Sequence, residues 1–261
     1  HMRDVLKLVR DLQRRKARER RSLVILEGWR LVEDAMGAGA KVVALLAAEG
    51  AEADALITRA SAAGIDLQTV PRRDFDAVAG TETPGGVIAV AEWEPLTLET
   101  LPAPKGAAVA LVLDAVQDPG NVGTMIRTAH ALGAWCTIAL DGTVDVRNPK
   151  VLRGAMGSHF RHPVATADFA DLATFVRAGA IDVCLAATDG TPVGGAAPPP
   201  AAGRVALVVG SEGHGVRPAW TDLPHRRVSI PDAPGRGVAQ CRRRRGHPPV
   251  RADACGSLIR G

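Results

Sequence analysis

The chain has 261 residues, a formal net charge of +4 at pH 7 and a hydrophobic fraction of 46%. This length suffices for one large or two small domains with a real core, and the mildly basic balance is compatible with a nucleic-acid partner. No apolar run approaches the roughly 20 residues that cross a bilayer and no secretory leader is visible, so we expect a soluble, cytoplasmic protein.

Residues 3–20 alternate apolar and basic side chains, after a His1-Met2 pair that resembles a cloning remnant. The alternation predicts a basic amphipathic helix. Two interpretations fit equally well: a solvated helix face, and a surface for RNA phosphates, whose contacts are mainly electrostatic. The second interpretation makes RNA-binding candidates of Arg14, Arg15, Lys16 and Arg18.

Short apolar runs alternate with helical patterns over the next 70 residues or so. We expect strands at 23–26, 42–46, 67–70 and 86–91, and helices at 29–36, 53–63 and 72–79. This alternation predicts a small α/β domain over residues 3–93. Residues 94–106 hold three prolines with little periodicity and are expected to form a linker.

From residue 107 the pattern indicates a doubly wound α/β domain with a parallel sheet. Val109–Leu113 reads as a buried strand, and Asn121 is expected to cap a helix that Gly133 ends. Further strands are predicted at 135–140, 183–188, 205–209 and 228–231, with helices at 149–156 and 171–178. Residues 194–203 read as a loop.

Two polar groups follow the Val109–Leu113 strand, at the edge where open α/β sheets place their sites. These two groups are Asn121 and Arg127. A second predicted strand, at 205–209, leads into a glycine loop that carries a third polar residue, Glu212. Taken singly, each has a plain explanation: a helix cap, a surface ion pair and a turn carboxylate. The loop lacks the spacing of a dinucleotide fingerprint and the lysine of a P-loop, which disfavours a dinucleotide-dependent oxidoreductase.

The sequence indicates no metal site. The four cysteines (Cys136, Cys184, Cys241 and Cys255) form no C-x-x-C pair, so neither zinc nor a disulfide scaffold is indicated. His159 and His162 have a spacing that could bind a metal, but no third ligand is evident. We therefore favour core or surface histidines.

Three segments carry a family resemblance. They read Asn121-x-Gly-x-x-x-Arg127-Thr-Ala, then Val208-Val-Gly-Ser-Glu-Gly-x-Gly215, then Ile230-Pro231. Their order and spacing resemble the three motifs of the SpoU (TrmH-type) RNA ribose 2′-O-methyltransferases of the SPOUT superfamily. The resemblance covers residues 107 to about 231. The basic start followed by Leu26-Glu27-Gly28 is similar to the ribosomal-protein-like domain that precedes the catalytic domain in this family.

The resemblance implies a trefoil-knotted SPOUT methyltransferase domain over residues 107–261, preceded by an α/β domain that holds substrate RNA. It implies S-adenosylmethionine as methyl donor, a homodimer, and RNA as substrate, with large-subunit rRNA favoured and tRNA left open. Asn121, Arg127 and Glu212 would be catalytic. The cofactor would contact Ala187, Thr188, Val209, Gly210, Ser211, Gly213, Ile230 and Pro231. Lys150 and Arg153 join the RNA-binding candidates.

After Pro231 the chain departs from the family, which continues with a Ser-Leu-Asn segment and an Ala-rich helix. Here the residues are rich in arginine and proline. Read back into codons and shifted by one base, residues 238–241 can become Ser-Leu-Asn-Val and 242–251 can become Ala-Val-Ala-Ala-Ala-Ile-Leu-Leu-Tyr-Glu, and Asp232 can become Met. We hypothesise a one-base insertion near codon 232 and rank an arginine-rich RNA-binding tail below it. If the tail is as written, the alternative function is a catalytically impaired RNA-binding protein of the same fold.

Overall fold

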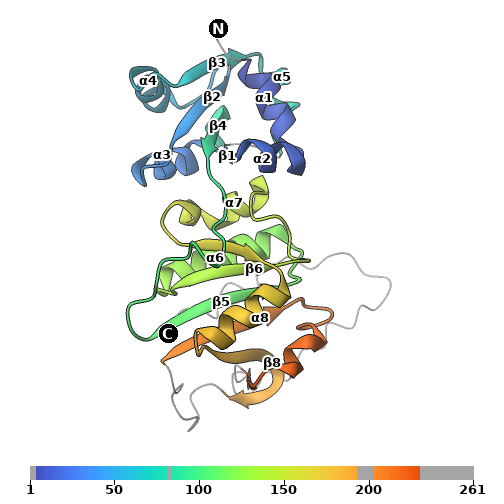
Figure 1. Cartoon of the computed structure of the whole chain (residues 1–261). Helices are drawn as coiled ribbons and strands as arrows, with labels where there is room; N and C mark the ends of the chain where they lie inside the picture. The colour runs from blue at the N-terminus through green and yellow to red at the C-terminus, as the bar shows by residue number, and fades with distance from the viewer. Residues whose placement is uncertain (1–3, 81–83, 193–202, 230–261) are drawn as a thin grey trace, which may run out of the picture. The chain divides into compact units, whose positions relative to one another are not determined.

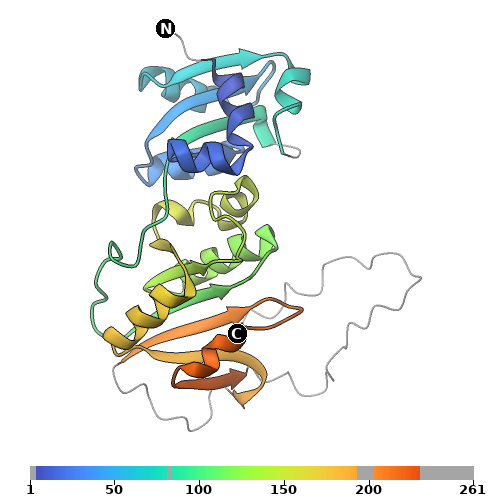
Figure 2. The same ribbon diagram turned by 45° about the vertical axis from the view of Figure 1, so that its right-hand side comes forward.

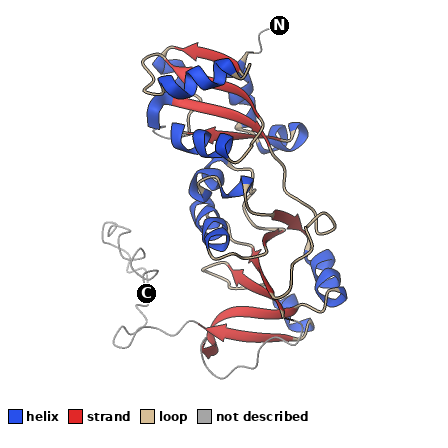
Figure 3. Ribbon diagram, turned by 90° about the vertical axis from the view of Figure 1, so that its left-hand side faces the viewer, coloured by secondary structure: helices blue, strands red, loops and turns tan. Residues whose placement is uncertain are grey.

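A computed structural model describes residues 4–80, 84–192 and 203–229, and in these residues the chain forms two separate sheets (Figure 1). The first sheet has four strands in the order β1-β4-β2-β3, and the second has six in the order β10-β8-β9-β5-β6-β7. Figure 3 shows helices flanking the strands of both sheets. No helix within the described ranges has the length and apolar character that crossing a lipid bilayer requires.

The first sheet is built from β1 (Leu23–Glu27), β2 (Val42–Ala48), β3 (Asp66–Val70) and β4 (Val87–Glu92). Strand β4 pairs antiparallel with β1 and β2, and β2 pairs parallel with β3. Helices α1 (Val5–Leu12), α2 (Arg15–Arg21) and α5 (Arg72–Asp76) bury apolar side chains on one face, and α3 (Trp29–Gly37) and α4 (Asp54–Ala62) on the other. Residues 84–86 form a short 3₁₀ turn, η1 (Pro84–Gly86), ahead of β4.

The expected single helix over residues 3–20 is wrong, because two helices occupy this segment. Helix α1 ends at Leu12, and Arg14 is extended, with φ −87° and ψ 131°, ahead of α2. The break lets Leu12 and Ala17 join the same buried cluster. Tertiary packing therefore overrides a periodicity that reads as continuous.

The second sheet is parallel throughout, as predicted. Its strands are β5 (Ala108–Asp114), β6 (Cys136–Leu140), β7 (Val164–Ala167), β8 (Asp182–Pro192), β9 (Arg204–Gly210) and β10 (His225–Ser229). The chain runs outward from β5 through β6 to β7 and then continues on the other side of β5, where β9 pairs with it. Strands distant in sequence therefore end side by side (Figure 2).

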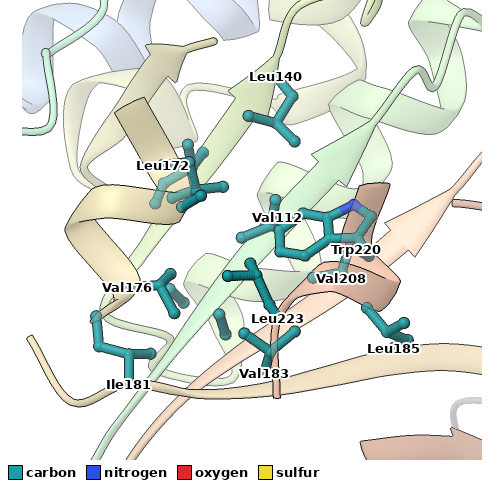
Figure 4. Close-up of a cluster of buried hydrophobic side chains, with 14 of the residues drawn as sticks. Val112, Leu140, Leu172, Val176, Ile181, Val183, Leu185, Val208, Trp220 and Leu223 are labelled. Atoms are coloured by element: carbon teal, nitrogen blue, oxygen red, sulfur yellow. The ribbon is translucent and has the colours of Figure 1, made fainter. Parts of the chain in front are cut away.

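Both faces of this sheet are covered. Helices α6 (Pro119–Ala131) and α7 (Pro149–Ala155) cover one face, with Val122, Ile126 and Val151 in the buried cluster. On the other face, α8 (Phe169–Ala178) and the 3₁₀ turn η3 (Pro218–Asp222) enclose Val112 and Val208 (Figure 4). A further 3₁₀ turn, η2 (Ser158–Phe160), follows α7.

Helix α6 begins differently from the prediction. Asp118, not Asn121, is its N-cap, and its Oδ1 accepts a hydrogen bond from the Asn121 backbone N–H at 2.7 Å. Pro119 occupies the first helical position, which the fixed φ of proline favours, so an Asp-Pro start moves the helix upstream. Gly133, with φ +72°, follows the C-cap and ends the helix as expected.

Strands β8 and β10 also differ from the prediction in their bounds. Strand β8 continues to Pro192, and β10 occupies 225–229 rather than 228–231. Ile230, Pro231, most of the 194–203 loop and the whole tail lie outside the described residues. The expected knot depends on this tail, so the described residues do not test it.

Candidate active site

Six of the eight predicted cofactor-binding residues lie near one edge of the second sheet, and the other two, Ile230 and Pro231, lie outside the described residues. Asp114, the last residue of β5, pairs with Gly210, the last residue of β9. On the other side of β9, Leu185 of β8 pairs with Val208. Ala187 and Thr188 come two and three residues after Leu185 in β8, so they lie near the level of Gly210.

A tight loop follows β9. Ser211 and Gly215 exchange backbone hydrogen bonds of 3.1 and 2.8 Å, and the Ser211 Oγ accepts a bond from the His214 N–H at 3.2 Å. A Cβ at Gly210 would collide with the Gly215 backbone, so only glycine fits there. Residues 212–215 are exposed, so this loop faces the solvent at the edge of the sheet.

Two of the three predicted catalytic residues meet at this loop. The Asn121 Nδ2 donates a hydrogen bond of 3.0 Å to the Glu212 Oε1, which joins the first turn of α6 to the glycine loop. The family resemblance implies that Asn121 orients Arg127 or a ribose, and that Glu212 holds either the loop or another motif residue. The observed bond agrees with the role given to Glu212.

Arg127 lies two turns into α6, on its exposed side. Its Nη1 is 2.8 Å from the Sδ of Met156, which has φ +48° and a side chain 58% exposed. Across the described ranges no carboxylate forms an ion pair with Arg127. The charge of this guanidinium is therefore available to an anionic ligand.

Helix α6 is held close to α7 by two glycines. A Cβ at Gly123 would come within 2.5 Å of the Val151 carbonyl oxygen and 2.8 Å of the Gly154 Cα. The two backbones are therefore in direct contact, and the position of Asn121 and Arg127 depends on α7.

Of the RNA-binding candidates, Arg18 requires a correction. Its side chain is 4% exposed and forms a 2.8 Å ion pair with Asp145, while its Nη1 donates to the carbonyl oxygens of Leu12 and Gln13. A guanidinium used in this way cannot reach a phosphate. Arg153 is partly committed as well, because it forms a 2.9 Å ion pair with the buried Glu27.

The remaining RNA-binding candidates have solvent-exposed side chains. They are Arg14, Arg15, Lys16 and Lys150, all exposed. Arg15 pairs with Glu19 on the same helix, at 2.7 Å.

The two histidines weighed as metal ligands are buried and hydrogen-bonded to the protein. His159 Nε2 donates to the Val146 carbonyl oxygen, and His162 Nε2 bonds the Thr137 hydroxyl, both at 2.9 Å. Burial lowers the pKa of each imidazole to about 4. Within the described ranges, no group of three His, Cys, Asp or Glu residues could hold a metal ion.

The sequence analysis missed one part of this edge, the contact between Asp114 and Arg217. The Asp114 side chain is 1% exposed and pairs with Arg217 at 2.8 Å, beside a cavity of about 660 Å³ that Gln117, Asp141, Ser211 and Gly213 also line. The sequence offers one signal for this contact: Asp114 ends a buried strand, and a buried carboxylate needs a partner. The sequence does not indicate that this partner is Arg217, which lies 103 positions further along the chain.

Comparison with known proteins places this geometry in a class. The model of the SpoU rRNA Methylase family matches residues 108–236, and that of the MRM3-like substrate binding domain matches residues 4–89. The chain is 34% identical over 225 residues to the 23S rRNA (guanosine(2553)-2′-O)-methyltransferase RlmP of Bacillus subtilis (strain 168), covering 85% of each protein. It is 29% identical over 181 residues to rRNA methyltransferase 3, mitochondrial, of Xenopus tropicalis, covering 66% of this chain but 42% of that protein.

Solved structures agree. The AdoMet-bound rRNA methyltransferase of Sinorhizobium meliloti superposes with a TM-score of 0.75 at 27% identity, covering 90% of this chain and 87% of that one. The SpoU methyltransferase AviRb of Streptomyces viridochromogenes, in complex with AdoMet, gives a TM-score of 0.75 at 25% identity over 91% of both chains. The fold is that of a SPOUT-type RNA methyltransferase. The chain belongs to the SpoU rRNA methylase family, which confirms the resemblance seen in the three motifs.

Proposed function

We propose that this protein transfers a methyl group from S-adenosylmethionine to a ribose 2′-hydroxyl of rRNA. The observation that carries the proposal is the Asn121–Glu212 bond, which joins two family motifs beside the glycine loop. Family membership and the relative RlmP, named as a 23S rRNA 2′-O-methyltransferase, support rRNA as the substrate class. Large-subunit rRNA is preferred to tRNA on the same grounds.

The residues present fit the cofactor. Gly210 lets the loop close tightly on itself, since a Cβ there would meet the Gly215 backbone, and the exposed Gly213 offers backbone hydrogen-bonding groups to a ligand beside Ser211. Ala187 and Thr188 lie in the neighbouring strand β8, just beyond its pairing with β9, and Val209 precedes the loop. These six residues would hold S-adenosylmethionine, together with Ile230 and Pro231 beyond the described part. When bound, the cofactor supplies an electrophilic methyl group.

The protein side chains then act on the RNA. Arginine stays protonated in proteins, so Arg127 would bind a phosphate beside the target ribose and stabilise charge that develops on its oxygen. Glu212 accepts a hydrogen bond from Asn121, and this contact fixes the Asn121 amide where it can orient the ribose. Positioning a weak nucleophile in line with the methyl group is the main task of such a site.

Basic side chains around one groove of the first helices support an RNA-binding role for residues 3–93. A cavity of about 930 Å³ is lined by Lys7, Arg10, Arg14, Arg20 and Arg21, with Asp4 and Asp11 as its acidic members. Asp11 pairs with Arg21 at 3.0 Å, whereas Lys7, Arg10 and Arg14 form no ion pair among the described residues. These three would contact phosphates, with residues 94–106 as linker to a methyltransferase domain at 107–261.

We also propose a cytoplasmic homodimer. Two large apolar side chains support self-association, Leu132 after α6 and Met156 after α7, which are 78% and 58% exposed. Met156 also contacts Arg127, so a partner that covers it would lie beside the site. The mechanism requires no metal, because the methyl donor is already activated.

The test is methyl transfer from tritiated S-adenosylmethionine to ribosomal RNA transcripts, followed by mapping of 2′-O-methylated positions. Incorporation at one ribose, abolished by a 2′-deoxy substitution there, is the expected result. RNA binding without incorporation would instead favour the catalytically impaired RNA-binding protein. A Lys7→Ala, Arg10→Ala, Arg14→Ala variant should weaken RNA binding and flatten its dependence on salt, because each lost phosphate contact removes about 0.7–0.9 from the log–log slope.

A further inference from the structure

A buried carboxylate lies where the central strand meets the glycine loop. The Asp114 Oδ2 accepts hydrogen bonds from the Arg217 backbone N–H at 2.6 Å and from the Trp220 Nε1 at 2.9 Å. The Oδ1 accepts from the Arg217 Nε at 2.8 Å. Three donors therefore compensate a carboxylate that burial would otherwise destabilise.

The remaining nitrogens of Arg217 reach the end of the next strand. Nη1 donates to both carboxylate oxygens of Asp141, at 3.1 and 3.2 Å, and Nη2 donates to the Asp141 carbonyl oxygen at 2.8 Å. The guanidinium also lies 5.3 Å from the centre of the Phe169 ring. Burial lowers the pKa of Arg217, but hydrogen bonds and charges from Asp114 and Asp141 raise it overall.

Both ends of the glycine loop are fastened to Asp114. At one end Gly210 pairs with Asp114 in the sheet, and at the other end Arg217, two residues after Gly215, binds the Asp114 side chain. Between them the Ser211–Gly215 bonds close the loop. A planar guanidinium with three bonded nitrogens can span both strand ends, whereas a lysine ammonium can serve only one point.

We propose that Arg217 is a positioning residue for the methyl donor. It holds residues 210–215 in the shape that receives S-adenosylmethionine and that presents Glu212 to Asn121. The inference rests on the proposed function and adds to it a residue outside the three motifs. Arg217 acts through the loop and makes no contact with the reacting atoms.

The test compares cofactor affinity in matched variants of the full chain. Arg217→Lys keeps the positive charge but cannot donate hydrogen bonds to Asp114 and Asp141 at the same time. We therefore expect the Kd for S-adenosylmethionine, measured by titration calorimetry, to rise about tenfold. Asp141→Asn removes the charge and one of the two side-chain acceptors of the second anchor, keeps the backbone acceptor, and should raise the Kd by roughly threefold. The KM for RNA should change less than about twofold in both, a split that general destabilisation would not give.

Arg161→Lys is the control, because Arg161 forms a 2.8 Å ion pair with Asp34, with no contact to the glycine loop. Its Kd should stay at the wild-type value. Equal cofactor affinity in wild type and Arg217→Lys overturns the inference. A loss of cofactor affinity in Arg161→Lys as large as that in Arg217→Lys overturns it as well. If Arg217→Lys does not fold, Asp141→Asn decides by the same criterion. Wild-type protein that binds no cofactor contradicts the proposed function itself.

Discussion

Glu212 is exposed, and its Oε1 accepts a hydrogen bond from the Asn121 Nδ2. Glu212→Ala removes that contact, and we expect kcat/KM for RNA methylation to fall by roughly 10- to 150-fold, the range of a charge-assisted hydrogen bond. Glu212→Gln can still accept a bond from the amide and should lose less. Initial-rate kinetics measure both.

Glu99→Ala is the control for this prediction, because Glu99 is exposed and lies in the segment between the two sheets. It should retain wild-type kinetics. Equal rates in Glu212→Ala and wild type would show that the pair has no part in catalysis.

Gly210 and Gly213 belong to the same loop but have different surroundings. A Cβ at Gly210 would overlap the Gly215 backbone, whereas nothing lies within 4 Å of a Cβ at Gly213. Gly210→Ala should therefore distort the loop and weaken S-adenosylmethionine binding by about tenfold or more. Gly213→Ala should bind with near-normal affinity in the same titration, and a reversed order would refute the loop geometry.

At the scale of elements, the contact between α6 and α7 carries a stability prediction. Gly123→Ala inserts a methyl group 2.5 Å from the Val151 carbonyl oxygen, so the helices must separate. We expect the free energy of unfolding, measured by urea titration, to fall by about 1–3 kcal/mol. Thr124→Ala, one residue away and exposed, should be close to neutral. An unchanged midpoint in Gly123→Ala would mean that the helices are not packed through their backbones.

The buried histidines at and after η2 predict a loss of stability in acid. His159 and His162 have a folded-state pKa of about 4, below the ordinary value of 6.5, so unfolding takes up protons between these values. Their contribution is complete above pH 6.5 and is lost as the pH falls towards 4. Thermal melting at pH 7 and pH 5 should show a lower Tm at pH 5.

His162→Gln removes one titrating group while keeping a partner for the Thr137 hydroxyl. The difference in Tm between the two pH values should be smaller in this variant. An identical difference would assign the acid sensitivity to other groups.

The elements that the sequence predicts well are those with a local cause. The parallel strands follow apolar runs, and Gly133 ends α6 because a positive φ favours glycine. The start of α6 was predicted too late because Asp118-Pro119 is the stronger signal. The break between α1 and α2 was missed because it depends on a core shared with strands far along the chain.

For the candidate site too, the sequence predicts individual residues better than the contacts between residues far apart in the chain. The motifs located Asn121 and Glu212, but not the bond between them, which spans 91 positions. Arg18 was misassigned because a basic run does not reveal which member turns inward to a buried aspartate. Arg217 has no local signal, since its role depends on two strand ends that meet only in the folded sheet. The roles of the site residues stay predictions until variants are measured.

At the scale of the whole molecule, the last 30 residues decide how complete the site is. The SpoU match ends at residue 236, close to the point where the motifs depart from the family. If a base was inserted near codon 232, intact-mass measurement of protein from a resequenced gene, with peptide sequencing of the tail, will give Ser-Leu-Asn-Val in place of residues 238–241. A protein whose tail has the arginine-rich sequence of residues 232–261, together with close relatives that carry the same tail, would contradict this hypothesis.

The pairing of β5 with β9 has a consequence for synthesis on the ribosome. Ala108 pairs with Arg204, so one edge of the central strand stays without its neighbour until most of the chain has been translated. The first sheet, by contrast, has all four strands once Glu92 has emerged. An apolar strand with an open edge pairs readily with other chains. The nascent second half is therefore the part most exposed to aggregation, and slower translation or a chaperone that covers β5 would favour its recovery in soluble form.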